Sequence, residues 1–332
     1  MQNGFITPIE RPKSLTEFCH AHTIMLFGSC FAEHIGARLA DGKFACDINP
    51  FGVLYNPMSI AEALKQIGQG RSYSPDSPEL VEHNGWHSLM HHSSFSAPSV
   101  NHCIDSINLR LNRATENWEK TDRLILTFGS AYVYHYNATG CIVGNCHKIP
   151  EREFTRRRLT CDEIVDAYES LIQSWISERP SLKILFTVSP IRHQKDGLHA
   201  NQLSKAVLLL AVDALVKRFP AHCFYFPAYE IMMDELRDYR FYNDDMLHPT
   251  PLAINYIWER FKSYYLSKQT QKTLQEWEVI QKALNHRPSN PASEAYNEFV
   301  NQLITKLEHF SQTHPEINIQ NELTSCHTRL KK

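Results

Sequence analysis

Two short segments of the chain carry residue types that could perform nucleophilic chemistry. Near the N-terminus, an apolar run beginning at Thr23 ends abruptly in Gly28-Ser29-Cys30, and helix-forming residues follow at once. This pattern predicts a buried strand, a tight turn that needs glycine, and the first turn of a helix. Free backbone N–H groups and the positive end of the helix dipole gather at such a turn, where they can receive developing negative charge. Ser29 and Cys30 are therefore both candidate nucleophiles.

The second segment lies late in the chain, where Asp245 and His248 form a D-x-x-H spacing. In a turn before a helix, this spacing lets a carboxylate hold one imidazole nitrogen while the other nitrogen faces a site. That arrangement is the orienting and basic half of a nucleophile–histidine–acid triad. The spacing alone recurs by chance, but here it precedes Pro249-Thr250-Pro251 and a long helical pattern. We predict that Asp245 orients His248 and that His248 is the general base.

Apolar runs typical of strands alternate with helical patterns between residues 20 and 268. The strand runs cover 23–28, 45–49, 123–128, 182–188 and 223–227, and the helical patterns cover 33–39, 59–67, 101–118, 161–176, 202–219 and a segment ending near 266. This alternation predicts an α/β domain with a mostly parallel sheet. Ligands bind beyond the carboxyl ends of such strands, near the point where strand order reverses. We expect Gly28-Ser29-Cys30, Gly129-Ser130 and Ser189-Pro190 at that edge.

Three other segments complete the domain organisation. Residues 132–136 and 141–146, joined by Asn137-Ala138-Thr139-Gly140, predict a β-hairpin. Residues 69–100 show no clear period and are expected to form a long loop, whose aromatic and histidine-rich part at 82–95 covers the site. Residues 269–332 are polar and helical in pattern. We therefore predict a domain at 1–268 and a helical C-terminal extension at 269–332, which packs on the domain or forms a homo-oligomer.

The composition is that of an ordinary globular protein. The 332 residues are 42% hydrophobic with a net charge of −2, which gives no electrostatic reason to expect nucleic acid or an anionic membrane as partner. The N-terminus has neither a basic nor an apolar leader region, and no apolar run approaches the roughly 18 residues of a membrane span. The nine cysteines include no C-x-x-C pair, which favours reduced thiols. We expect a cytoplasmic protein with a small-molecule substrate.

The chain resembles a known family over roughly residues 20–265. Gly28-Ser29-Cys30-Phe31-Ala32 spells the name motif of the GSCFA family, which is related to the SGNH (GDSL-like) hydrolases. Further matches to the family pattern are 49–57, 145–150, 188–193 and Ser204-Lys205. The resemblance implies a flavodoxin-like three-layer α/β/α fold and a hydrolase without cofactor. It also implies an esterase, thioesterase or acyltransferase that acts on a small acyl ester, with Asp245–His248 as its last block.

The chain departs from the hydrolase pattern in two places. Laid without gaps on a G-D-S-L block, Cys30 falls on the serine nucleophile; a turn one residue tighter presents Ser29 instead, and both readings stay open. The G-x-N-D block expected after the third strand is replaced by Gly129-Ser130-Ala131-Tyr132, without asparagine. The remaining candidates for oxyanion or substrate binding are Gly28, Gly52 as a backbone donor, Asn145 as the replacement amide, His92 and His147.

Two alternatives remain beside the hydrolase. The missing G-x-N-D favours a catalytically silent ligand-binding protein on the same fold. A metal-dependent hydrolase would draw on soft or borderline ligands, namely Cys30, His92, Cys146, His147 and His248. Their spacings match no standard zinc pattern, and adjacent residues on a strand point to opposite faces. We therefore expect no metal. Ser204-Lys205 is most simply a pair at a helix N-terminus, with a site carboxylate or a substrate anion as the alternative partner of Lys205.

Overall fold

The computed structural model describes residues 6–13, 15–290 and 293–330. Its centre is a five-stranded parallel sheet in the order β10-β9-β5-β1-β2. These strands are β1 (Thr23–Gly28), β2 (Ala45–Ile48), β5 (Arg123–Phe128), β9 (Lys183–Val188) and β10 (Cys223–Phe226). Strand order reverses between β1 and β5, because the chain first adds β2 on one side and then crosses to the other. This is the flavodoxin-like doubly wound order, and the predicted parallel sheet is confirmed.

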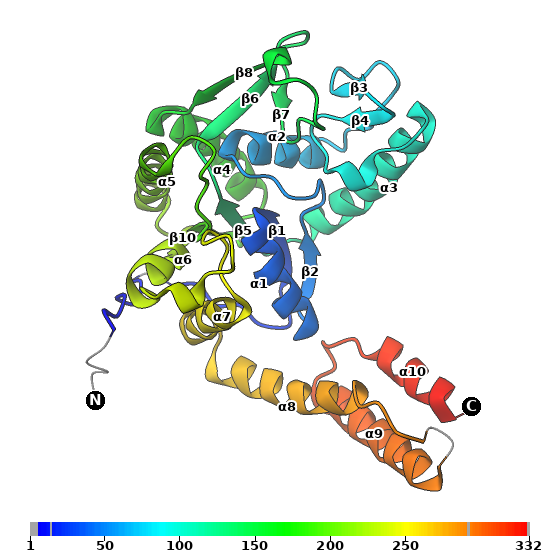
Figure 1. The fold of residues 1–332 in the computed structure, drawn as a ribbon. Helices are drawn as coiled ribbons and strands as arrows, with labels where there is room; N and C mark the ends of the chain where they lie inside the picture. The colour runs from blue at the N-terminus through cyan, green and yellow to red at the C-terminus, as the bar shows by residue number, and fades with distance from the viewer. Residues whose placement is uncertain (1–5, 14, 291–292, 331–332) are drawn as a thin grey trace.

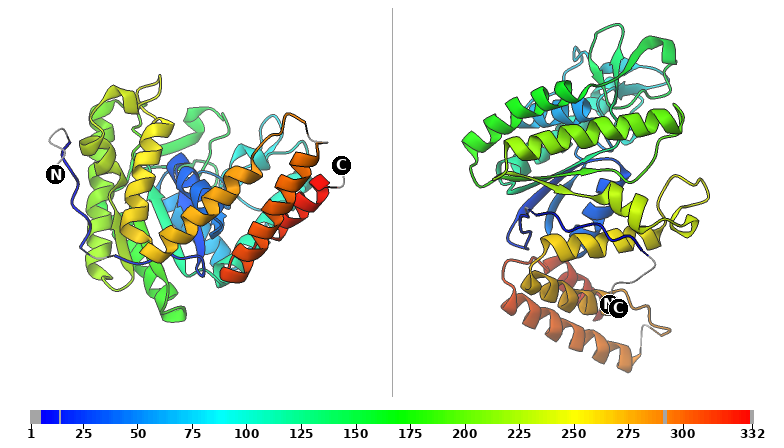
Figure 2. Two further views of the ribbon diagram at one scale, coloured as in Figure 1. Left: turned by 90° about the horizontal axis from the view of Figure 1, so that it is seen from below. Right: turned by 90° about the vertical axis from the view of Figure 1, so that its left-hand side faces the viewer.

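Helices cover both faces of this sheet (Figures 1 and 2). One face carries α2 (Pro57–Gly68), α3 (Val100–Glu119), α4 (Cys161–Glu178) and α5 (Leu198–Arg218), and the other carries α1 (Cys30–Asp41) and α7 (Pro251–Tyr265). Because side chains alternate along a strand, β1 supplies both cores. Phe27 packs with the first set of helices and Leu26 with the second. The three-layer α/β/α architecture is therefore confirmed.

Two small sheets are inserted in the chain, one between α2 and α3 and the other between β5 and α4. Residues 69–100, expected to be an irregular loop, contain the hairpin of β3 (Leu80–Glu82) and β4 (Trp86–Ser88) and the 3₁₀ turn η1 (Ser93–Phe95). That expectation was wrong because strands of three residues are too short to show alternation. The predicted hairpin is present as β6 (Tyr132–Tyr136) and β7 (Ile142–Val143). The turn η2 (Glu151–Glu153) then leads to β8 (Phe154–Arg158), which pairs with β6 and was not predicted.

The chain after β10 returns to the sheet edge and then leaves the main domain. The segments α6 (Ala228–Glu230), η3 (Ile231–Glu235) and η4 (Tyr239–Phe241) precede α7. Beyond α7, the helices α8 (Lys268–Leu284), α9 (Glu294–Thr313) and α10 (Gln320–Leu330) share a separate apolar cluster and extend away from the sheet (Figure 1). The Trp277 indole N–H donates to the Asp41 carbonyl at 2.7 Å, which ties α8 to the end of α1. In the described part of the chain, no helix has the length and apolarity needed to cross a membrane.

Candidate active site

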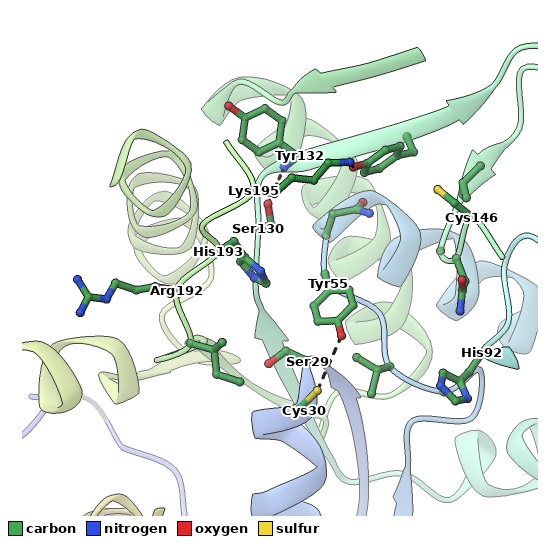
Figure 3. A pocket seen from close by; sticks show the side chains of 18 of the residues that line it. Ser29, Cys30, Tyr55, His92, Ser130, Tyr132, Cys146, Arg192, His193 and Lys195 are labelled. Atoms are coloured by element: carbon green, nitrogen blue, oxygen red, sulfur yellow. Dashed lines mark hydrogen bonds between the residues drawn. The ribbon is translucent and has the colours of Figure 1, made fainter. Parts of the chain in front are cut away.

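The carboxyl ends of β1, β5 and β9 open into a cleft of about 970 Å³. The cleft lies where strand order reverses, which is the usual ligand position in a doubly wound sheet. The small β6-β7-β8 sheet and the turn η1 with its N-cap residue His92 contribute its outer walls. Its lining includes Ser29, Cys30, Tyr55, His92, Ser130, Asn145, Cys146, Arg192, His193 and His248 (Figure 3). The three predicted turns therefore do meet at one edge.

Ser29 is the N-cap residue of α1. Its Oγ accepts a hydrogen bond from the Phe31 N–H at 3.3 Å and donates one to the Ser189 Oγ at 3.0 Å. Ser29 is only 1% exposed. An N-cap hydroxyl satisfies one of the unpaired N–H groups at a helix start. The Ser29 hydroxyl is therefore engaged within the protein on both its donor and its acceptor side.

Cys30 is the first residue of α1 and is only partly buried. Its Sγ faces the cleft and lies 3.8 Å from the Tyr55 hydroxyl (Figure 3). At this position the sulfur lies near the positive end of the helix dipole and the free N–H groups of the first turn. Both residues line the cleft, but Cys30 is only partly buried, whereas Ser29 is almost wholly buried and donates its hydroxyl proton to Ser189.

Asp245 and His248 form the contact that their spacing predicts. One oxygen of Asp245 accepts the N–H groups of Leu247 and His248 at 2.9 Å each, and the other lies 2.5 Å from the His248 Nδ1. The two backbone N–H groups, with the imidazole, lower the pKa of Asp245 to about 2. The His248 ring lines the cleft, is 48% exposed, and its Nε2 has no hydrogen-bond partner among the described residues. No hydrogen bond joins it to either candidate nucleophile in that part of the chain.

Two of the predicted backbone donors are already occupied. The Gly52 N–H donates to the Asn49 carbonyl at 2.7 Å, so the prediction that it is free to bind an oxyanion was wrong. The Gly28 N–H likewise donates to the Asn49 side chain at 2.9 Å. Asn145 lines the cleft and its Oδ1 accepts the His147 N–H at 3.0 Å, while its Nδ2 has no partner among the described residues. Asn145 thus keeps a donor that could face a ligand.

The two histidines predicted to bind substrate differ in position. His92 lines the cleft, and its Nδ1 accepts the Ser94 N–H at 3.2 Å. His147 lies outside the cleft, with its Nε2 bonded to the Ser88 carbonyl at 2.8 Å and its ring stacked on His87. That prediction was wrong because β7 ends at Val143, and residue 147 sits in a turn with a positive φ of 47°.

The described residues supply no set of ligands for the metal ion of a metal-dependent hydrolase. Within residues 6–13, 15–290 and 293–330, no group of three or more His, Cys, Asp or Glu side chains is arranged to hold a metal ion. The five candidate ligands named from the sequence therefore do not converge in that part of the protein.

Sequence analysis assigned no site role to Tyr55 or His193, and it misplaced Lys205. The Lys205 Nζ donates to the carbonyl oxygens of Gly129 and Ser189 at 2.7 Å each, not to a carboxylate or into the cleft. Its complete burial lowers its pKa to about 7. Burial, aided by nearby Lys205, also lowers the pKa of His193 to about 4, so this ring is neutral at pH 7. All three residues stood in matched motifs, which was the available signal.

The fold and the cleft together define a doubly wound α/β protein with a thiol at the switch point of its sheet. The chain belongs to the GSCFA family, whose model matches residues 23–261. A second model, described as the C-terminal domain of GSCFA domain proteins, matches residues 277–332. The solved structures include one described as "a putative platelet activating factor from Streptococcus pneumonia". It is 13% identical over 73% of this chain and 83% of that chain, with a TM-score of 0.36. The comparison with curated proteins finds no match.

Proposed function

We propose that this protein transfers acyl groups from a small ester or thioester to water or another acceptor, with Cys30 as its nucleophile. One observation carries the proposal: the Cys30 thiol opens into the cleft that His248 also lines, whereas the Ser29 hydroxyl donates to Ser189 in the interior. The GSCFA membership and the relation to SGNH hydrolases that its motif implies agree with this assignment.

The chemistry follows the usual course of covalent acyl transfer. His248 takes the thiol proton, and the Cys30 sulfur attacks the acyl carbonyl carbon while the carbonyl electron pair moves to oxygen. When the tetrahedral intermediate collapses, His248 returns the proton to the leaving oxygen or sulfur. In hydrolysis, water then gives a proton to His248 and attacks the thioester, which releases the acid and restores Cys30. A positioned base of this kind contributes about 10²–10⁴ in rate.

Asp245 supports this course through His248. Because its carboxylate holds the His248 Nδ1 and stays ionised, the ring presents Nε2 to the cleft. No hydrogen bond joins the ring to the thiol in the described part of the chain, so the ring must approach Cys30 when substrate binds. Catalytic hydrogen bonds often tighten only in the substrate complex.

Acyl-enzyme trapping tests the proposal. The protein is mixed with p-nitrophenyl acetate, quenched in acid, and analysed by intact mass and peptide mapping beside Cys30→Ala, Ser29→Ala and His248→Ala. We expect one acetyl group on Cys30, its absence in Cys30→Ala, its retention in Ser29→Ala, and slower acetylation in His248→Ala by about 10²–10⁴. Acetylation of Ser29, independent of Cys30, would contradict the choice of nucleophile.

A second candidate is a ligand-binding protein without turnover. The exposed His248 ring, unbonded to Cys30, and the absence of asparagine at 129–132 favour it. This candidate predicts saturable binding of acyl esters with no acyl-enzyme, and equal background hydrolysis by the wild type and His248→Ala.

A further inference from the structure

Tyr55, in the loop between β2 and α2, is held in place through its main chain by the turn after β5. Its carbonyl oxygen accepts the N–H groups of Gly129 at 2.8 Å and Ser130 at 2.9 Å. These are the residues at which the hydrolase pattern would place G-x-N-D. The turn therefore carries no asparagine side chain but uses two backbone donors to fix Tyr55 above the cleft.

The close approach of Tyr55 depends on glycine and on a neighbouring histidine. A Cβ at position 129 would lie 3.2 Å from the Tyr55 carbonyl oxygen and 3.4 Å from its ring carbon Cδ1, both tight contacts. The His193 ring meets the Tyr55 ring edge to face, with centroids 5.7 Å apart and planes at 87°. The ring is thus held by packing, and its orientation does not depend on its hydroxyl.

The Tyr55 hydroxyl itself points at Cys30. Its hydrogen-bond partner is the Cys30 Sγ at 3.8 Å, and it has no other within the described residues (Figure 3). Partial burial raises the pKa of Tyr55 above its ordinary value, and the nearby thiol raises it further. The hydroxyl therefore keeps its proton at neutral pH. Once the Cys30 sulfur is a thiolate, it has no proton to give. The protonated Tyr55 hydroxyl beside it must then be the hydrogen-bond donor.

We propose that the Tyr55 hydroxyl is a catalytic hydrogen-bond donor that stabilises negative charge on the Cys30 thiolate and then on the oxyanion formed there. This inference rests on the proposed function, in which Cys30 is acylated. The acyl oxygen extends from Sγ into the cleft, and an oxyanion donor must lie about 2.7–3.1 Å from it. A hydroxyl 3.8 Å from Sγ is within reach of that position. The proton stays on Tyr55 throughout, so the step needs no other reactant.

The test is Tyr55→Phe, which removes the oxygen and keeps the ring packing against His193. The first measurement is the rate of iodoacetamide alkylation of Cys30 against pH, followed by peptide mapping because the chain has nine cysteines. We expect the midpoint of the Cys30 profile to rise by about 1–2 pH units, as for the loss of a hydrogen bond to a charged group. A profile that superimposes on that of the wild type overturns the thiolate part of the proposal.

The second measurement is the acetylation rate of Cys30 by p-nitrophenyl acetate at a pH above both alkylation midpoints. There the thiol is ionised in both proteins, so a slower reaction reports the oxyanion alone. We expect Tyr55→Phe to lose about 10²–10³ in rate, and an unchanged rate overturns the oxyanion part. If the wild type forms no acyl group on Cys30, the proposed function and the oxyanion part both fail, while the alkylation profile still decides the thiolate part.

Two further variants separate the loss of the Tyr55 hydroxyl from other effects of the substitution. Tyr296 lies on α9, outside the cleft lining. Tyr296→Phe also removes a tyrosine hydroxyl and should match the wild type in both measurements. Replacement of Tyr55 by 3-fluorotyrosine keeps its shape and makes the hydroxyl a stronger donor, so the alkylation midpoint should fall. A midpoint that rises with fluorotyrosine, as with phenylalanine, would indicate lost packing and overturn the proposal.

Discussion

The hydroxyl of Ser29 donates a hydrogen bond to the hydroxyl of Ser189 across 3.0 Å at the carboxyl edge of the sheet. Ser189 is itself wholly buried, and its carbonyl oxygen accepts a hydrogen bond from Lys205. Ser29 is therefore part of an interior network that joins α1, the end of β9 and α5. Because the Ser29 hydroxyl already donates its proton to Ser189 in the interior, it is poorly placed to give that proton to His248. The neighbouring thiol faces the cleft, where its hydrogen-bond partner is the Tyr55 hydroxyl.

The first prediction separates the structural and chemical roles of this turn. Ser29→Ala removes the N-cap of α1 and should lower the free energy of unfolding by about 0.5–2 kcal/mol, measured by urea denaturation. Acetylation of Cys30 should persist. Ser267→Ala removes the equivalent cap of α8, far from the cleft, and should cost a similar amount. A folded Ser29→Ala protein that forms no acyl-enzyme would contradict this division of roles.

The second prediction concerns the carboxylate that holds His248. Asp245→Asn keeps an oxygen for the N–H groups of residues 247 and 248 but loses the charge beside the ring, so kcat should fall by about 10²–10⁴. Asp244→Asn, at an exposed neighbour with no role in that turn, is the control and should retain the wild-type kcat. Equal loss in both variants would mean that the charge acts at long range and not through the 2.5 Å contact.

The contribution of Asp245 to the stability of the protein should change with pH in a definite direction. Because its pKa is lowered to about 2, its contribution to stability is present above about pH 4, the ordinary aspartate pKa, and is lost as the pH falls towards 2. Any fall in activity between pH 7 and pH 4 must then come from another group. The advantage in unfolding free energy of the wild type over Asp245→Asn should therefore decline only below about pH 4, which urea unfolding at several pH values measures.

The third prediction concerns the buried amine of Lys205. Its pKa of about 7 lies below the roughly 10.4 of an unfolded lysine, so the unfolded chain binds more protons between these values. Below pH 7 the amine is charged in both states, so the buried charge lowers the free energy of unfolding by its full amount. The free energy of unfolding then rises as the pH increases towards 10. The difference in unfolding free energy between the wild type and Lys205→Met should therefore shift in favour of the wild type from pH 7 to pH 10.

Urea unfolding at several pH values measures this difference. His193 does not interfere in this range, because its pKa is about 4. Lys217→Met, on the exposed side of the same helix, should give a difference that stays flat from pH 7 to pH 9. Parallel stability curves for the wild type and Lys205→Met would contradict the lowered pKa.

The local features of this molecule could be predicted from the sequence. The sheet strands were visible as apolar runs buried on both faces, and Asp245 and His248 needed only a three-residue spacing to meet. β8 was hidden because its three consecutive arginines interrupt any apolar pattern. The displacement of His147 followed from a positive φ at a residue other than glycine, which no residue type announces. A sequence carries little information on such backbone choices.

The contacts of Tyr55 and Lys205 were beyond the sequence for a different reason. Tyr55 meets Cys30, Gly129 and His193 only because three loops from separate strands converge at one sheet edge. Lys205 reaches two carbonyl oxygens that become neighbours only when β5 and β9 pair. Such contacts depend on tertiary packing. In the sequence, the one sign of a role for these residues was that they lie in segments that match the family pattern.

The fourth prediction tests how His92, the N-cap residue of η1, is positioned in the cleft. Gly52 has a φ of 78°, and a Cβ there would lie 2.2 Å from the Cβ of His92. Gly52→Ala should therefore cost about 1–3 kcal/mol in backbone strain and also push His92 away from the cleft, which raises KM for p-nitrophenyl acetate. Gly140→Ala is the matched control, because its φ of 72° gives similar strain while a Cβ there meets nothing within 4 Å. It should lower stability by a similar strain cost with an unchanged KM, and an equal KM in both variants would show that His92 does not shape substrate binding.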